Sequence, residues 1–246
     1  MWVKVLSITD LHDEKKTATL RIGQSAFFSP EMTTGAPVAE RASTGFGHHM
    51  TKRAIDLFGA SAALLMLLPL FLAVALMIRF DSPGPVLFKQ VRWGKGGQKI
   101  RVYKFRSMRT DLGDATGVAQ TVKGDARITA VGAILRRTNI DELPQLLNVL
   151  KGEMSLVGPR CHAIGMLAAG IPYEELVPDY HQRHVMRPGI TGLAQMRGLR
   201  GPTDRPGKAR ARIASDLYYV NNFSVWLDIR IIFGTVISEL RGGKGF

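Results

Sequence analysis

The longest apolar run in the chain covers residues 57–78 and contains no charged side chain. A helix of this length matches a hydrocarbon core of roughly 30 Å, and a soluble helix that is apolar on every face is unusual. Basic residues flank the run, with Lys52 and Arg53 before it and Arg79 and Lys89 after it. Because positive flanks favour the cytoplasmic side of a membrane, the pattern predicts that both ends lie on one face.

Pro69 lies near the middle of this run. Its ring and its missing N–H disrupt a helix and permit a sharp bend. Together with the flanking charges, this predicts a re-entrant membrane helix over residues 50–80, which enters the bilayer, bends at Pro69 and leaves on the side of entry. The alternative is a kinked helix that spans the membrane.

The remainder of the chain mixes two periodicities. Residues 86–93 and 99–108 alternate between apolar and polar side chains across a glycine-rich turn, which predicts a β-hairpin. Helical patterns cover residues 129–137, 141–150, 173–185, 209–220 and 224–240. We therefore expect an α+β fold, mainly helical, with a small cytosolic-face domain over residues 81–246 that carries any chemistry.

The N-terminal part has a different character. Residues 1–22 alternate around a charged stretch, as a short hairpin-like segment does. Residues 23–49 are rich in Gly, Ser, Thr, Pro and Ala, with little periodicity. This composition predicts a flexible linker.

Charge narrows the classes of partner. The 33 Lys and Arg residues exceed the 20 Asp and Glu residues and give a net charge of +13, which suggests nucleic acid, an anionic membrane or a phosphorylated substrate as partner. Aromatic residues make up only 8%, and we recognise no nucleic-acid motif, so we expect no nucleic-acid partner. Cys161 is the only cysteine, which excludes an internal disulfide and fits the cytosolic side. A non-catalytic, basic, membrane-anchored binding protein is the competing hypothesis.

An adjacent acidic pair, Asp141 and Glu142, is the strongest candidate for chemistry. Asn139 precedes Glu142 by three residues, which is the spacing of a capping box that starts a helix. The same carboxylates also suit a second role, since ionised acids hold a divalent cation and one of them can attack phosphorus. The two interpretations are compatible.

Several basic side chains are candidates for binding phosphate oxygens. They are Lys104, Arg106, Arg136, Arg160 and Arg187. For any single one of them, a solvated basic face beside anionic lipid is an equally good interpretation. His181 and His184 have a spacing that suits metal binding, but without a third ligand an exposed helical face is the better interpretation.

The order of several short motifs carries a resemblance. The motifs are KFRSM (residues 104–108), DARIT (125–129), LRRTNIDELPQLLNVLKGEMSLVGPR (135–160), RPGITGLAQ (187–195) and DLYYV (216–220). From about residue 50 to its end, the chain resembles the bacterial sugar transferase family, the monotopic polyprenyl-phosphate phosphoglycosyl transferases, in its minimal catalytic form. It departs from the family at Cys161, where proline usually follows GPR.

The resemblance implies a reaction. Asp141 would attack the sugar-linked phosphate of a UDP-sugar and release UMP, and a polyprenyl phosphate, namely undecaprenyl phosphate, would then accept the phosphosugar. Magnesium would be held by Asp141 and Glu142, and Arg160 would bind phosphate, with Arg136, Arg106 and Arg187 as weaker matches. Direct sugar transfer is the alternative chemistry, and it would release UDP.

The resemblance also implies a place in the cell. We expect the cytoplasmic face of the bacterial inner membrane, with membrane lipids as further partners. The pattern is compatible with a homo-oligomer. It leaves open the sugar, and it leaves open exopolysaccharide, capsule, O-antigen or a protein glycan as the product.

Overall fold

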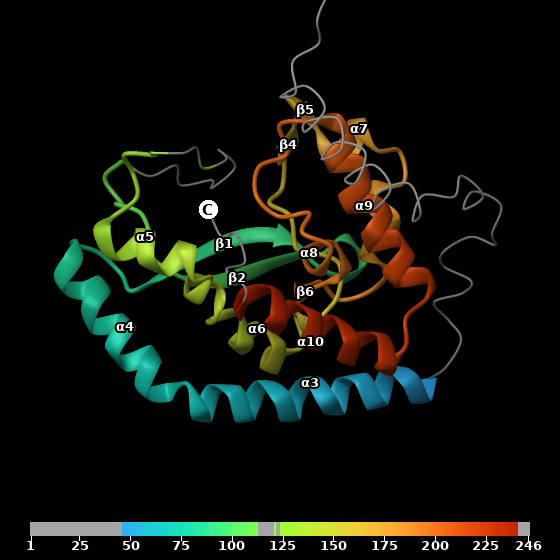
Figure 1. Ribbon diagram of the computed structural model, residues 1–246, viewed down its shortest axis with the longest axis horizontal. Helices are drawn as coiled ribbons and strands as arrows, with labels where there is room; N and C mark the ends of the chain where they lie inside the picture. The colour runs from blue at the N-terminus through green and yellow to red at the C-terminus, as the bar shows by residue number, and fades with distance from the viewer. Residues whose placement is uncertain (1–45, 113–120, 122–123, 241–246) are drawn as a thin grey trace, which may run out of the picture. The chain divides into compact units, whose positions relative to one another are not determined.

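The computed structural model describes residues 46–112, 121 and 124–240 (Figure 1). The segment predicted over residues 1–22 and all but the end of the linker predicted over 23–49 lie outside these residues. Helix α3 (Phe46–Met66) begins within the predicted linker, so the last four residues of that segment are helical.

Two consecutive helices form the long apolar segment. Helix α3 is followed by α4 (Leu68–Asp81), and the pair is bent by 61° at a break of one residue, Leu67. Pro69 lies in the first turn of α4, where its missing N–H costs no helical hydrogen bond. The predicted break near Pro69 is therefore present, two residues before the proline. Among the described residues no single helix is long and apolar enough to cross a bilayer, although this bent pair together has a suitable length and composition.

Much of the apolar surface of the bent pair is not covered by the rest of the protein. Phe58 is 80% exposed, Leu65 75% and Phe80 87%. Uncovered apolar surface on this scale marks contact with another apolar phase or partner.

The predicted hairpin is confirmed. Strands β1 (Leu87–Trp93) and β2 (Lys99–Phe105) pair antiparallel, with Leu87 opposite Phe105. The turn between them contains Gly96 and Gly97 at φ 66° and 73°, a left-handed conformation that favours glycine. Val102 and Phe105 point into two apolar cores, one shared with α3 and α6 (Gln145–Lys151), the other with α4 and α5 (Ala130–Arg137).

The remaining elements are helices and very short strands. They are η2 (Ile140–Glu142), β3 (Ser155–Val157), β4 (Leu167–Ala168), β5 (Ile171–Pro172), α7 (Tyr173–Leu176), η3 (Tyr180–Val185), β6 (Gly189–Thr191), α8 (Leu193–Met196), α9 (Pro206–Asn221) and α10 (Val225–Leu240). Strand β3 pairs in parallel with β6, and β4 pairs antiparallel with β5. The helix predicted over 173–185 is divided into α7 and the 3₁₀ helix η3, since Pro178 falls between them.

Helix α3 is tied to the domain by its own charged side chains. The Lys52 ammonium donates to Asp228 Oδ2 over 2.6 Å and to the Val157 carbonyl over 2.9 Å. Arg53 donates to two carbonyl oxygens at the end of α6. The charged groups of both cations are therefore bound by acceptors within the domain.

A third charged side chain of α3, Asp56, also binds the rest of the domain. Asp56 is buried, and its Oδ1 accepts hydrogen bonds from the Ser155 hydroxyl over 3.0 Å and from the Leu156 N–H over 2.9 Å. Figure 1 shows α3 running beneath α6 and α10, with the hairpin above them. Helix α3 and the rest of the domain therefore form a single packed unit.

Candidate active site

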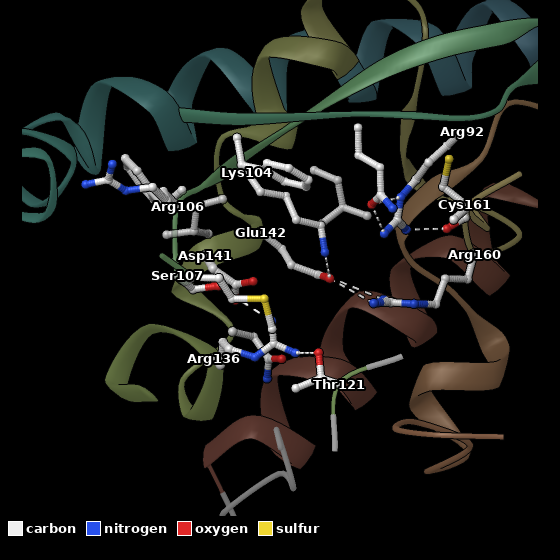
Figure 2. A pocket seen from close by; sticks show the side chains of 18 of the residues that line it. Arg92, Lys104, Arg106, Ser107, Thr121, Arg136, Asp141, Glu142, Arg160 and Cys161 are labelled. Carbon is white, nitrogen blue, oxygen red and sulfur yellow. Dashed lines mark hydrogen bonds and ion pairs between the residues drawn. The ribbon is translucent and has the colours of Figure 1, made fainter. Parts of the chain in front are cut away.

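A pocket of about 950 Å³ opens between the hairpin, η2, the loop after β3 and the end of α10. Basic side chains dominate its polar lining, among them Arg92, Lys104, Arg127, Arg136, Arg160 and Arg212. The acidic pair lies within this pocket (Figure 2). Such a concentration of cations in a concave site suits a ligand with several negative charges.

The acidic pair lies on a single 3₁₀ turn, η2, that follows α5. Asn139, immediately before the turn, has a left-handed backbone with φ 55° and makes no capping hydrogen bond. Its amide instead donates to Glu239 Oε2 on α10 over 3.0 Å. The predicted capping box is therefore wrong, because both of its side chains are engaged by partners elsewhere in the fold.

Glu142 is held by two cations. Lys104 Nζ donates to its Oε1 over 2.7 Å, and Arg160 donates to Oε1 over 2.8 Å and to Oε2 over 3.3 Å. Burial alone would raise the pKa of Glu142, but Arg160 and Lys104 outweigh it and hold that pKa well below its ordinary value. Glu142 is therefore an ionised group with both oxygens engaged.

Asp141 differs from its neighbour. Its side chain lies in the pocket and is only 7% exposed, yet within the described part of the chain no group donates a hydrogen bond to its carboxylate. Burial raises the pKa of Asp141, Lys104 opposes that shift, and the charge of Glu142 adds to it. A buried carboxylate without a donor, beside cations that attract phosphate, is suited to act as a nucleophile.

Two further arginines complete the cationic lining. Arg136 donates to the Thr121 hydroxyl over 2.7 Å, and its charge opposes the rise that burial causes in the pKa of Asp141. Arg92 donates to the Cys161 carbonyl over 2.6 Å. The strand register places Arg92 and Lys104 on one face of the hairpin, and that alternation was the signal by which sequence reasoning could have included Arg92 in the site.

Two of the predicted phosphate-binding arginines donate to backbone carbonyls, although Arg106 is among the residues that line the pocket. The Arg106 guanidinium donates to the carbonyls of Ile78, Ser82 and Pro83 at the end of α4, and Figure 2 shows it pointing away from the acidic pair. Arg187 donates to the Gly152 carbonyl over 2.7 Å and is not among the residues that line the pocket. Helix ends leave carbonyl oxygens without partners, and these arginines bind such groups.

The family model for bacterial sugar transferases matches residues 47–242. The chain belongs to the bacterial sugar transferase family. The resemblance drawn from the motifs is confirmed, and the acidic pair, Lys104 and Arg160 all fall within the matched region.

Three relatives show how this transferase compares with curated proteins. It is 76% identical over 195 residues, 79% of its own chain and 98% of the other, to the exopolysaccharide production protein PSS of Rhizobium leguminosarum bv. phaseoli. It is 48% identical over 197 residues, 80% of its chain and 72% of the other, to the UDP-glucose:undecaprenyl-phosphate glucose-1-phosphate transferase of Caulobacter vibrioides.

The third relative, of the same name, is from Escherichia coli K12 and is 45% identical over 218 residues, which are 88% of this chain and 45% of the other. The transferase therefore spans less than half of that longer protein. Membership of an enzyme family removes the alternative of a non-catalytic binding protein.

The described side chains of the transferase fit a magnesium ion only in part. Among residues 46–112, 121 and 124–240, no group of three or more His, Cys, Asp or Glu side chains is placed to hold a metal. Magnesium is usually bound through one or two carboxylates together with substrate phosphates. Asp141 suits that role, whereas Glu142 would first have to leave Lys104 and Arg160.

His181 and His184 lie with their Nδ1 atoms 3.5 Å apart. His184 is buried and His181 exposed, so the expected exposed helical face is correct for one of the two. The Cys161 thiol donates to the Trp93 carbonyl over 3.2 Å, and burial raises its pKa. Neither feature supplies a reactive group to the pocket.

Proposed function

We propose that this transferase moves glucose 1-phosphate from UDP-glucose to undecaprenyl phosphate through a covalent intermediate on Asp141, as the first membrane step of exopolysaccharide synthesis. The observation that carries the proposal is the Asp141 carboxylate, which has no hydrogen-bond donor among the described residues and lies in a cation-lined pocket. The names of the relatives support the donor, the acceptor and the product class.

The first step forms one bond and breaks one. An Asp141 oxygen attacks the phosphorus that carries glucose, and the bond between that phosphorus and the bridging oxygen of the diphosphate breaks. UMP leaves with the electron pair of that bond. In the second step a phosphate oxygen of the lipid attacks the same phosphorus, displaces the Asp141 carboxylate and forms the lipid diphosphosugar.

The neighbouring side chains support this chemistry. Glu142 is saturated by Lys104 and Arg160, so it is a poor nucleophile and instead fixes both cations at the side of Asp141. Cations held in that position stabilise charge that develops on the breaking diphosphate. Magnesium, when bound by Asp141 and the diphosphate oxygens, would offset the repulsion between carboxylate and donor.

We further propose that α3 and α4 form a re-entrant membrane segment on the cytoplasmic face. The bend of 61° and the exposed apolar side chains support this topology. It would hold the pocket at the level of lipid headgroups, where the phosphate of the acceptor lies.

Intact-protein mass spectrometry tests the chemical step. Wild type and Asp141→Asn are incubated with magnesium and UDP-glucose, with UDP-galactose and UDP-N-acetylgalactosamine as competing donors and no lipid acceptor. We expect a mass gain of one glucose phosphate in wild type, with release of UMP, and no gain in Asp141→Asn. Donor-dependent release of UDP after lipid is added, without any adduct, would favour direct glycosyl transfer and overturn the proposal.

A further inference from the structure

A second cavity, of about 740 Å³, lies between α3 and α10. Ala54 and Phe58 line it from α3, Ile232 and Val236 line it from α10, and Leu156 lies between them. None of the described residues that line this apolar groove is charged. It is therefore unsuited to a nucleotide or a sugar and suited to hydrocarbon.

The apolar groove adjoins the catalytic pocket. Leu143, Ile190, Thr191 and Thr235 line both cavities. Thr191 and Thr235 are the polar residues among the described lining of the groove, and their hydroxyls are hydrogen-bonded to each other over 2.7 Å where the cavities meet. Leu143 directly follows the acidic pair in the sequence. A ligand that fills the groove would therefore have one end beside the nucleophile.

The outer side of the apolar groove opens onto the uncovered surface of α3 and α10. Phe58, which lines it, is 80% exposed, and Val236 on the opposite wall is 50% exposed. Hydrocarbon that reaches the groove from an apolar phase on this face would not have to cross water. A protein segment docking there would bring backbone polar groups, for which the described lining offers only the Thr191 and Thr235 hydroxyls, which are already hydrogen-bonded to each other.

We propose that the apolar groove binds the isoprene units of the acceptor lipid that follow the first one and directs its phosphate to Asp141. This inference rests on the proposed function for the identity of the acceptor. A polyprenyl phosphate joins a long apolar chain to a charged head. The apolar groove suits the chain, and the adjoining cation-lined pocket suits the head. The groove thereby makes transfer depend on the length of the chain.

Filling the groove tests the proposal. Ala54→Trp places a bulky ring at an exposed groove position, and Ala62→Trp is the matched control at an exposed position of the same helix outside the groove. Val236→Trp blocks the opposite wall and serves as the second variant if Ala54→Trp does not fold. Donor-only UMP release, transfer to undecaprenyl phosphate and transfer to dimethylallyl phosphate, which has a single isoprene unit, are measured for each.

We expect Ala54→Trp to raise the KM for undecaprenyl phosphate at least tenfold, to leave transfer to dimethylallyl phosphate at the wild-type rate, and to match wild type in donor-only UMP release. Ala62→Trp should equal wild type in all three. An unchanged KM for undecaprenyl phosphate in both groove variants would overturn the proposal, as would an equal rise in Ala62→Trp, which would indicate general contact with lipid. Absence of donor-only UMP release in wild type would instead count against the aspartyl intermediate, and the chain-length comparison could still be made on lipid product.

Discussion

Arg160 donates to both carboxylate oxygens of Glu142, over 2.8 Å to Oε1 and 3.3 Å to Oε2. The adjacent Asp141 shares the same short turn, but within the described chain it receives no hydrogen bond. Two neighbouring acids thus have opposite environments, which shift their pKa values in opposite directions. When the pKa values of two neighbouring carboxylates are shifted in opposite directions, the two groups suit different chemical roles.

Replacing Asp141 should stabilise the fold while abolishing the adduct. Burial raises the pKa of Asp141, so ionisation opposes folding once the pH exceeds the unfolded pKa of about 3.9. Asp141→Asn removes that cost, and we expect a higher thermal midpoint at pH 7, by about 2–4 °C for each kcal/mol gained. The gain should vanish below about pH 4. A lower midpoint at pH 7 would contradict this assignment.

The same shift predicts the pH dependence of the first step. The nucleophile must be ionised, and its pKa is raised by burial. We therefore expect adduct formation to decline on acidification at a pH above about 3.9, the ordinary value for aspartate. Rapid-quench measurement of UMP release between pH 4 and 8 gives the midpoint. A midpoint below the ordinary value would show that the surrounding cations dominate over burial.

Glu142→Gln should lower both the stability of the fold and the rate of adduct formation. The lowered pKa of Glu142 means that its charge stabilises the fold above the unfolded pKa of about 4.3, and that this contribution is lost as the pH falls through the folded value. At pH 7 we expect the free energy of unfolding to fall by roughly 1–3 kcal/mol, since two half-buried cations lose their charged partner. Adduct formation should slow on the order of 10²-fold.

An exposed pair provides the control for Glu142→Gln. Asp111 binds Arg109 with side chains 59% and 54% exposed, so Asp111→Asn should leave the free energy of unfolding almost unchanged. Denaturant titration of both variants makes the comparison. Similar losses in the two would show that the Glu142 pairs are no stronger than surface ion pairs.

Arg106 and Arg136 should separate structure from substrate binding. Arg106→Ala removes hydrogen bonds to three carbonyls at the end of α4, each worth about 1.5–3 kcal/mol from a charged donor. We expect lower stability with an unchanged KM for the UDP-sugar. Arg136→Ala, at the pocket, should raise that KM and change stability less. The reverse outcome would restore the phosphate-binding role that the sequence suggested for Arg106.

The buried pair between Lys52 and Asp228 predicts a rescue. Lys52→Met alone leaves a buried carboxylate without its cation and should cost roughly 3–5 kcal/mol. The double variant Lys52→Met with Asp228→Leu should recover most of that loss, because hydrophobic replacement of a buried pair is close to neutral. Chemical denaturation of all three proteins in detergent measures the coupling. Additive losses would show that the two charges do not interact.

The elements with strong local patterns could be predicted from sequence. The hairpin, the break near Pro69 and the helices α5, α9 and α10 follow from periodicity and from proline chemistry. The acidic pair and Arg160 were identified by their motifs. All these features depend on side chains close together in the chain.

Features that depend on distant partners could not be predicted. Arg106 was predicted to bind phosphate because its motif gives no sign that its guanidinium donates to the carbonyls of Ile78, Ser82 and Pro83 at the end of α4. Asn139 was taken as a cap, yet its amide binds Glu239 on the last helix described. The inequality between Asp141 and Glu142 likewise arises from the β2 and GPR-loop cations, which only the tertiary fold brings together.

The six hydrogen bonds that Lys52, Arg53 and Asp56 make from α3 to the rest of the domain have a mechanical consequence. The helix is hydrogen-bonded to α10 through Lys52, to α6 through Arg53 and to β3 through Asp56. Helix α3 and the part of the domain that holds Asp141 therefore pack as one rigid unit. Any roll or tilt that a lipid phase imposes on α3 is therefore transmitted to Asp141 as a rigid rotation. If α3 lies in a bilayer as proposed, a change in bilayer thickness would therefore move the Asp141 carboxylate relative to the membrane plane, where the proposed lipid acceptor presents its phosphate.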